Sequence, residues 1–316
     1  MGPPYYEPAT RNGPLRSPIN AKRGYDYFQA EAVVVQMEIK RWSLVAVVIG
    51  MVNVMLLVEG CLEEERIALL QIKTSFYSPN GLSSQYYSWG KDANCCNWEG
   101  VYCSVTTGRV VTLDLIIKRL EDWYLNATLF LPFQELNSLD LSGNNILGCV
   151  QNEGFEILSK LDNLEDLYLS SNKFNNSILT SLSALSSLKS LFLSGNRLKG
   201  SINIEGGEAL LELSNLEVLS LGENRFNNSI LQSLKKLDAL INLKSVVLDG
   251  NKIDKFMFAK DSRGFPNLSS LYLYNMTTNG RSIPFSLLQS LAKFANLRTL
   301  VLGWNHFDGT ILAQGD

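Results

Sequence analysis

One nine-residue pattern recurs along most of the chain and limits the folds that it can adopt. The pattern is LxxLxLxxN, and LEDLYLSSN, which ends at Asn172, is one copy of it. Copies aligned on their last residue end at Asn144, Asn172, Asn196, Asn224, Asn251, Met276 and Asn305. These anchors are separated by 28, 24, 28, 27, 25 and 29 residues. Such a sustained period predicts a stack of similar coils, because each unit buries its apolar face only against its neighbours.

The spacing and the fixed leucines define the expected coil. Periods of 24 to 29 residues are those of a leucine-rich repeat and are too short for ankyrin or tetratricopeptide units. In a short strand with alternating sides, the leucines of LxL point into the coil and their neighbours face solvent. Residues 110–115, VVTLDL, fit a first strand. We therefore expect an α/β solenoid, a leucine-rich-repeat horseshoe with a parallel concave sheet.

The asparagine that ends each copy has a structural explanation. It stands where the strand ends and the chain turns, so backbone N–H and C=O groups there lack partners within the coil. An amide offers donors and an acceptor, and can satisfy these groups while tying one coil to the next. The expected asparagine ladder comprises Asn144, Asn172, Asn196, Asn224, Asn251 and Asn305. Met276 interrupts the ladder, so we expect a local irregularity in residues 274–280, YNMTTNG.

The first 60 residues lack the repeat. Residues 1–36 contain Pro, Gly and Tyr without an apolar period, which predicts a disordered extension. Residues 37–60 have the layout of a secretory signal, with Lys40 and Arg41 before the seventeen uncharged residues 42–58. The run is slightly short for a spanning helix, which favours a cleaved signal peptide starting at Met37. Translation from Met1 would instead favour an uncleaved signal anchor, with membrane association through residues 42–58.

The charges around this run predict the compartment. Positive residues precede it and Glu59, Glu63, Glu64 and Glu65 follow it. Positive charge tends to stay on the cytosolic side, so the repeats are expected on the non-cytosolic side in both cases. The expected localisation is the secretory pathway, ending at the plasma membrane or outside the cell.

Residues 61–108 are expected to form a cap at the start of the solenoid. The cysteines of this segment are Cys61, Cys95, Cys96 and Cys103. In an oxidising compartment such a cluster indicates two disulfides rather than a metal site. Three pairings are open, although Cys95 and Cys96 are poor partners for each other because a bridge between neighbours strains the peptide. Residues 63–76, EEERIALLQIKTSF, predict a short amphipathic helix.

Composition argues against several functional classes. The net charge is −3, so no basic surface for nucleic acid is expected. His306 is the only histidine, and no zinc-ligand set or Ser-His-Asp arrangement is found. We therefore expect no enzyme activity, no cofactor and no metal. Cys149 is outside the cap; it fits a buried small apolar residue, with a reactive or intermolecular thiol as the alternative.

Function is expected from the solvent-facing positions of the strands. At about 4.8 Å per strand, seven or eight strands form a sheet roughly 30 Å wide. Such a surface suits an extended peptide or a protein better than a small metabolite. The candidate ligand-binding residues are Asp140, Asp166, Tyr168, Phe192, Val247, Tyr272, Tyr274 and Trp304. Alternatively, the large side chains among them only cover the sheet or contact further repeats.

Asn-x-Ser/Thr sequons fit a secreted protein. They start at Asn126, Asn175, Asn227, Asn267 and Asn275. Asn175 and Asn227 occupy equivalent positions in their coils, beyond the strand, and are the strongest candidates for glycosylation. Asn275 lies close to the sheet edge, where steric blockage is the alternative.

The cap and repeat motifs also resemble those of a known family. DANCCNWEGVYC, residues 92–103, together with ALLQIKTSF and SGNRLKGSI, resembles the N-terminal part of plant leucine-rich-repeat receptor-like proteins. The resemblance implies a cell-surface glycoprotein that acts in defence or developmental signalling, binds an extracellular peptide or protein and works with a membrane co-receptor kinase. It also implies cysteine pairing in chain order, Cys61–Cys95 and Cys96–Cys103. Residues 109–316 are then expected to be repeats truncated at the C-terminal end.

Two functional hypotheses follow. The first is the ligand-binding ectodomain, or a fragment of one, of a receptor-like protein. The alternative is a secreted protein similar to plant polygalacturonase inhibitors, which share the cap and the repeat. The variable repeat spacing and the lack of a second cysteine pair near the C-terminus favour the receptor.

Overall fold

The computed structural model describes most of the chain beyond residue 60. The described residues are 61–76, 85–116, 121–151, 154–200, 209–228, 230, 240–253, 267–276, 283–284, 291 and 294–308. They all belong to one compact unit, Leu56–Asp316. The expected disordered extension, residues 1–36, and the expected signal segment, residues 37–60, lie outside them. Within the described residues, no helix combines the length and apolarity needed to cross a bilayer.

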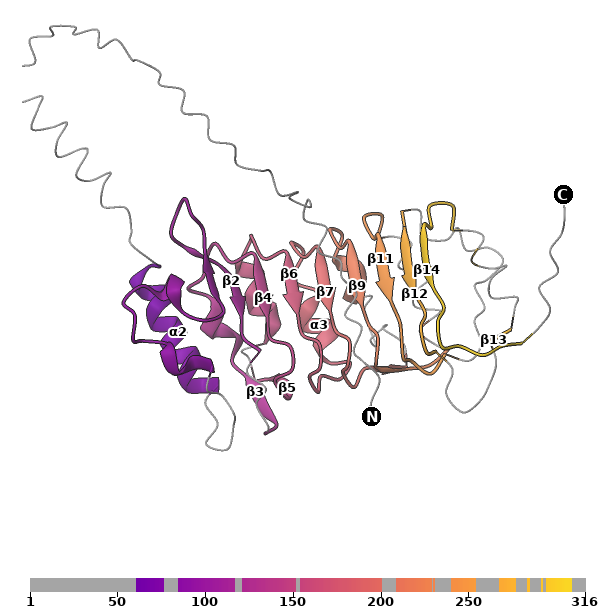
Figure 1. Cartoon of the computed structure of the whole chain (residues 1–316), viewed down its shortest axis with the longest axis horizontal. Helices are drawn as coiled ribbons and strands as arrows, with labels where there is room; N and C mark the ends of the chain where they lie inside the picture. Colours follow the sequence, from indigo (N-terminus) through magenta and orange to yellow (C-terminus); the bar gives the residue numbers. More distant parts are fainter. Residues whose placement is uncertain are drawn as a thin grey trace, which may run out of the picture. The chain divides into compact units, whose positions relative to one another are not determined.

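The main element is a nine-stranded sheet in which neighbouring strands come from successive coils (Figure 1). Its strands, in order, are β1 Val101–Cys103, β2 Val110–Asp114, β4 Ser138–Asp140, β6 Asp166–Tyr168, β7 Ser190–Phe192, β9 Val218–Ser220, β11 Ser245–Val247, β12 Ser270–Tyr272 and β14 Thr299–Val301. β1 pairs with β2 in the antiparallel sense, and every later pair is parallel. The predicted leucine-rich-repeat solenoid is confirmed.

Short elements connect the strands of the main sheet. Three two-stranded parallel sheets follow the ladder positions: β3 Trp123–Leu125 with β5 Ile146–Cys149, β8 Lys199–Gly200 with β10 Arg225–Phe226, and β13 Ile283–Pro284 with β15 Phe307–Asp308. The return segments carry single helical turns, namely η3 Ala127–Phe130, η4 Phe155–Lys160, α3 Ile178–Leu182 and η5 Ala209–Glu212. Each coil is therefore strand, turn, short extended segment and return.

The core is a column of leucines that the alternation of each strand turns inward. Leu139, Leu167, Leu191 and Leu219 stand at the same strand position and are fully buried. Leu300 occupies this position on β14 but is 37% exposed. β14 is the last strand of the sheet, and among the described residues only β12 lies beside it. The exposure of Leu300 shows that burial in this fold requires a coil on both sides.

The N-terminal cap packs a helix against the first coil. Helix α2 spans Glu63–Phe76 and buries Leu69, Ile72 and Phe76, as its pattern predicts. The Phe76 ring meets Trp123 of β3 edge-on, with the ring centroids 4.7 Å apart. The remaining cap elements are the single turns η1 Gln85–Ser88 and η2 Cys95–Asn97.

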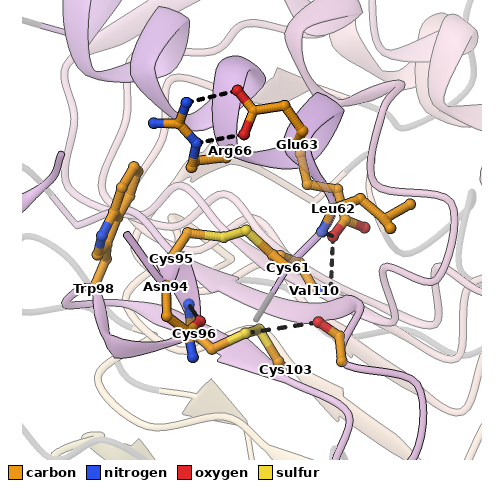
Figure 2. The surroundings of a disulfide bond; sticks show 12 residues. Cys61, Leu62, Glu63, Arg66, Asn94, Cys95, Cys96, Trp98, Cys103 and Val110 are labelled. Carbon is orange, nitrogen blue, oxygen red and sulfur yellow. Dashed lines mark hydrogen bonds and ion pairs between the residues drawn. A yellow bond between two sulfur atoms is a disulfide. The ribbon is translucent and has the colours of Figure 1, made fainter. Parts of the chain in front are cut away.

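Covalent and ionic links hold the cap together. Disulfides join Cys61 to Cys95 and Cys96 to Cys103, the pairing in chain order (Figure 2). Glu65 is fully buried on α2, and its Oε1 accepts a hydrogen bond of 2.8 Å from Nε of Arg109, just before β2. Glu65 Oε2 also accepts the Val110 N–H at 3.3 Å. A buried charge is tolerated only with such partners, so this pair fixes the cap against the solenoid.

Candidate ligand-binding surface

The asparagine ladder runs across the main sheet, just beyond the C-terminal ends of its strands. Asn172 shows the geometry: its Nδ2 donates to the carbonyl oxygens of Leu141, 2.9 Å away in the preceding coil, and Leu169, 3.2 Å away in its own. Its Oδ1 accepts the N–H of Ile146 at 2.9 Å. The same arrangement of donors holds for Asn144, Asn196, Asn224, Asn251 and Asn305. The ladder keeps successive strands in register.

Met276 stands where the ladder expects an asparagine. Its side chain is fully buried, and its backbone N–H donates to Oδ1 of Asn305 at 2.7 Å. β12 and β14 keep the regular register, and the next pairing, Leu273 N–H to Val301 O at 2.8 Å, is also intact. The expected irregularity is therefore wrong for residues 274–276, because the backbone bonds between coils do not need the side chain. Residues 277–280 lie outside the described residues.

A second row of side chains ties the coils at the opposite end of the strands, and the sequence analysis missed it. Asn215 is typical: its Nδ2 donates to the backbone oxygen of Ser186 in the preceding coil, 2.9 Å away. Equivalent bonds come from Asn163, Ser187, Asn242 and Asn267. The signal was present, because an Asn or Ser precedes the first leucine of these repeats. Together the two rows hold both ends of each strand.

The exposed face of the sheet carries one row of side chains at its centre. β4, β6, β7 and β9 place Asp140, Tyr168, Phe192 and Ser220 side by side in register. The rings of Tyr168 and Phe192 are stacked, with centroids 4.5 Å apart and planes 6° from parallel. Both rings remain half-buried and in reach of solvent. Such a pair is a rigid apolar feature on an otherwise flat sheet.

Val247 does not belong to the exposed set. It follows Ser220 in the row, but it is only 7% exposed, and Ser220 is 4% exposed. The prediction that Val247 faces a ligand is therefore wrong. Val247 is short and lies in register with the larger Tyr272 of β12. Tyr272 itself is half-buried, like the two stacked rings.

Tyr274 lies two residues beyond β12 and Trp304 three residues beyond β14, at the end of the sheet away from the cap. Their ring centroids are 6.1 Å apart, and Trp304 is 73% exposed. Trp304 has a φ of 56°, the left-handed conformation that Gly195 and Gly250, and also Ser171, Glu223 and Asn275, adopt at the equivalent position. The left-handed residue therefore belongs to the turn of each repeat and does not single out Trp304 as a functional position.

Asp249 lies beside Tyr274. Its Oδ1 accepts the Tyr274 N–H at 2.6 Å. Burial, with a further contribution from the charge of Glu223, raises the pKa of Asp249 to about 6, although the bond from Tyr274 opposes this shift. The charge at this end of the face therefore changes in mildly acidic solution.

Acidic residues dominate the end of the exposed face that is next to the N-terminal cap. Asp114, Asp140 and Asp166 come from the neighbouring strands β2, β4 and β6, and each is half-buried. Beside them, along the strand starts, the charges alternate and pair: Lys189 lies 2.7 Å from Glu165, and Lys244 lies 2.7 Å from Glu217.

The sequons differ in their surroundings. Asn175 is exposed, and its Oδ1 accepts the N–H and the hydroxyl of Ser177 at 2.9 and 2.7 Å. Asn126 makes the equivalent bonds but is half-buried and caps η3. Asn227 and Asn275 are exposed. Asn267 is also exposed, but its Nδ2, the atom that would carry a glycan, belongs to the second row of inter-coil bonds.

Cys149 ends strand β5 and is a half-buried free thiol. Burial, aided by the charge of Glu156, raises its pKa to about 12. The thiolate is the reactive form, so this environment favours the interpretation of Cys149 as a packing residue over a reactive thiol.

Comparison with known proteins shows which proteins this chain resembles. Residues 62–104 match a model of the leucine rich repeat N-terminal domain, and residues 163–185 match the leucine rich repeat. Cuscuta receptor 1 of Solanum lycopersicum is 33% identical over 272 residues, which is 82% of this chain and 21% of that protein. Receptor-like protein 14 of Arabidopsis thaliana is 45% identical over 132 residues, which is 39% of this chain and 14% of that protein. The chain is therefore similar to the N-terminal part of plant leucine-rich-repeat receptor-like proteins.

The similarity covers a limited part of these relatives. The chain spans about a fifth of the length of the first relative and less of the second. Among solved structures, the leucine-rich-repeat ectodomain of the plant membrane receptor kinase GASSHO1/SCHENGEN3 from Arabidopsis thaliana, in complex with CASPARIAN STRIP INTEGRITY FACTOR 2, matches this chain. The match covers 77% of this chain and 30% of the ectodomain. The TM-score is 0.51 at 24% identity, which supports the shared fold. Leucine-rich-repeat ectodomains of this kind are not typically enzymes.

Proposed function

We propose that this chain forms the extracellular, ligand-binding N-terminal portion of a plant receptor-like protein in defence or developmental signalling. The observation that carries the proposal is the exposed row of the nine-stranded sheet. Two rows of side-chain hydrogen bonds hold the strands, while the residues between them vary from coil to coil. A rigid surface with variable side chains is suited to recognising a peptide or a protein.

The compartment supports the same proposal. Two disulfides in the cap fit an oxidising environment, and the relatives are plant receptor-like proteins. Residues 37–60 would direct the chain into the secretory pathway, either cleaved before the cap or retained as an anchor. N-terminal sequencing of protein from the medium and from the membrane fraction tests this step: a terminus near Cys61 in the medium supports cleavage, and a terminus at Met1 in the membrane fraction supports the anchor.

The ligand surface in this proposal consists of the exposed members of the candidate set. These are Asp140, Asp166, Tyr168, Phe192, Tyr272, Tyr274 and Trp304. A bound ligand would then be presented to a membrane co-receptor kinase, the partner that the similarity to plant receptor-like proteins suggests. Aromatic side chains on a rigid element are the expected anchors of such an interface.

The test uses the secreted full chain and a peptide fraction of plant extracellular fluid. A Tyr168→Ala, Phe192→Ala, Tyr272→Ala variant should retain less than a tenth of the binding of the parent protein. Tyr124→Ala is the matched control: Tyr124 is 59% exposed on β3, outside the main sheet. If the triple variant and the control bind equally well, the sheet face is not the ligand surface.

A further inference from the structure

The central row of the exposed face changes from acidic to aromatic side chains within a few strands. Asp114, Asp140, Tyr168, Phe192 and Ser220 are successive register partners across the strands from β2 to β9. The row therefore begins with two carboxylates, continues with two stacked rings and then drops to a small buried side chain. A ligand that lies across the strands meets these features in that order.

The stacked rings define two different environments. Their centroid separation of 4.5 Å is close to the spacing of neighbouring strands, about 4.8 Å. The stacking direction therefore runs along the row. The outer face of Tyr168 is turned toward Asp140 on β4, and the outer face of Phe192 is turned toward Ser220 on β9.

The charge at the first of these environments is negative. Asp114 and Asp166 form no ion pair among the described residues. Lys189 interacts electrostatically with Asp166, but its ammonium is bound by Glu165, 2.7 Å away. The negative potential of these carboxylates also reaches the cap. There, burial and then the charges of Asp114, Glu99 and Asp140 raise the pKa of Tyr86.

We propose that the face from β2 to β9 binds an extended peptide with a cationic side chain and, about four residues away, an aliphatic side chain. This inference rests on the proposed function and specifies its ligand. The cation lies between the carboxylates and the outer face of Tyr168, where ion pairing and cation–π attraction add together. The aliphatic side chain lies against Phe192, above the small Ser220 and Val247.

The spacing follows from the register. The two environments lie on the outer faces of the stacked pair, two to three strand spacings apart in the register, or about 10–14 Å. An extended peptide rises about 3.3 Å per residue and returns to the same face every second residue, so positions i and i+4 fit this distance. Arginine is preferred to lysine as the cation because its planar guanidinium can stack on the ring while it bonds to a carboxylate.

The experiment selects a random dodecapeptide display library against the secreted full chain. The peptides that are enriched are synthesised, and their affinities are measured by fluorescence anisotropy at low and high salt. We expect an arginine or lysine four positions from Leu, Ile or Val, and weaker binding at high salt. The Asp114→Asn, Asp140→Asn, Asp166→Asn variant should bind at least tenfold more weakly and lose most of the salt dependence.

Matched variants separate this effect from net charge and from misfolding. Asparagine Oδ1 can still accept the Ser142 N–H that Asp140 accepts at 2.8 Å, so the backbone near the substitution is retained. The control removes the same number of charges from exposed residues outside the main sheet, through Glu156→Gln, Asp162→Asn and Glu212→Gln. Its affinity should equal that of the parent.

The outcomes distinguish the two proposals. Enriched peptides without a cation, or equal binding by the asparagine variant, overturn the ligand assignment. If the ligand assignment is overturned but a Tyr168→Ala, Phe192→Ala double variant no longer binds, the sheet face is still the binding surface. If no peptide is enriched, or if binding ignores both sets of substitutions, the proposed function fails along with the ligand assignment.

Discussion

The asparagine ladder makes a quantitative prediction at Asn196, which is 6% exposed. Replacement by leucine keeps the approximate size of the side chain and removes its hydrogen bonds. Asn196 Nδ2 donates to Leu169 O at 2.9 Å and Leu193 O at 3.0 Å, and Oδ1 accepts the Phe174 N–H at 3.0 Å. The substitution affects the hydrogen bonding of these three partners to different extents.

The two carbonyls keep a second donor after the substitution. Leu169 O also accepts from Asn172 at 3.2 Å, and Leu193 O also accepts from Asn224 at 2.9 Å. Each carbonyl therefore loses one of two bonds, at about 1 kcal/mol each. The Phe174 N–H loses its acceptor, and a buried unsatisfied donor costs about 1–3 kcal/mol. The added apolar contacts of leucine offset about 1 kcal/mol, so Asn196→Leu should lower the free energy of unfolding by about 3 kcal/mol.

Met276→Leu is the matched control. Met276 occupies the same ladder position, is equally buried and already lacks an amide. A volume-conserving apolar exchange costs less than about 1.5 kcal/mol. Urea unfolding of the secreted protein, followed by circular dichroism, compares the two variants, and hydrogen exchange at the Phe174 amide reports on the orphaned donor. Equal losses in both variants, with unchanged protection of Phe174, would refute the role assigned to the ladder.

Three further predictions concern the cap, pH and glycosylation. Glu65→Ala leaves Arg109 without its buried partner and should cost about 3 kcal/mol in urea unfolding, whereas Glu63→Ala, at an exposed site, should change little. The pKa of Asp249 is about 6 in the folded state and about 3.9 in the unfolded state. The folded protein therefore binds this proton more tightly, so the stabilisation from the protonated carboxyl is complete below a pH of about 3.9 and is lost as the pH rises through 6. Asp249→Asn should therefore gain stability relative to the parent between pH 4 and 7, and a constant difference would contradict this assignment. Mass spectrometry of secreted protein should find glycan at Asn175 and none at Asn267; the reverse occupancy would show that the inter-coil bond of Asn267 does not protect it.

Much of the fold could be predicted from the sequence because the same short pattern of leucines and asparagine specifies each coil. A leucine at the inner position of a short strand is buried whatever coil it belongs to, so Leu139 and Leu219 follow one rule. The helix of the cap follows from its apolar spacing in the same way. Leu300 breaks the rule because burial also depends on the neighbouring coil, which a pattern within one repeat does not contain.

The exposed face was harder to predict because exposure there depends on neighbours across the sheet. Tyr168 and Val247 occupy equivalent positions, yet one remains half-buried and the other is covered. Side-chain length in the adjacent strands decides the difference. The second row of inter-coil bonds was overlooked for another reason: Asn215 and Ser187 differ in type, although both reach a backbone oxygen of the preceding coil.

The two rows of hydrogen bonds explain how this fold combines a constant backbone with a changing surface. The buried leucines already specify the register of each strand, because a slip by one residue would turn them outward. The amides of Asn172 and Asn215 also fix the register from the two ends of the strands, through backbone atoms that every sequence possesses. The central row therefore does not have to hold neighbouring strands in register. It can place carboxylates beside stacked rings, as Asp140 and Tyr168 do, without altering the coil that holds them.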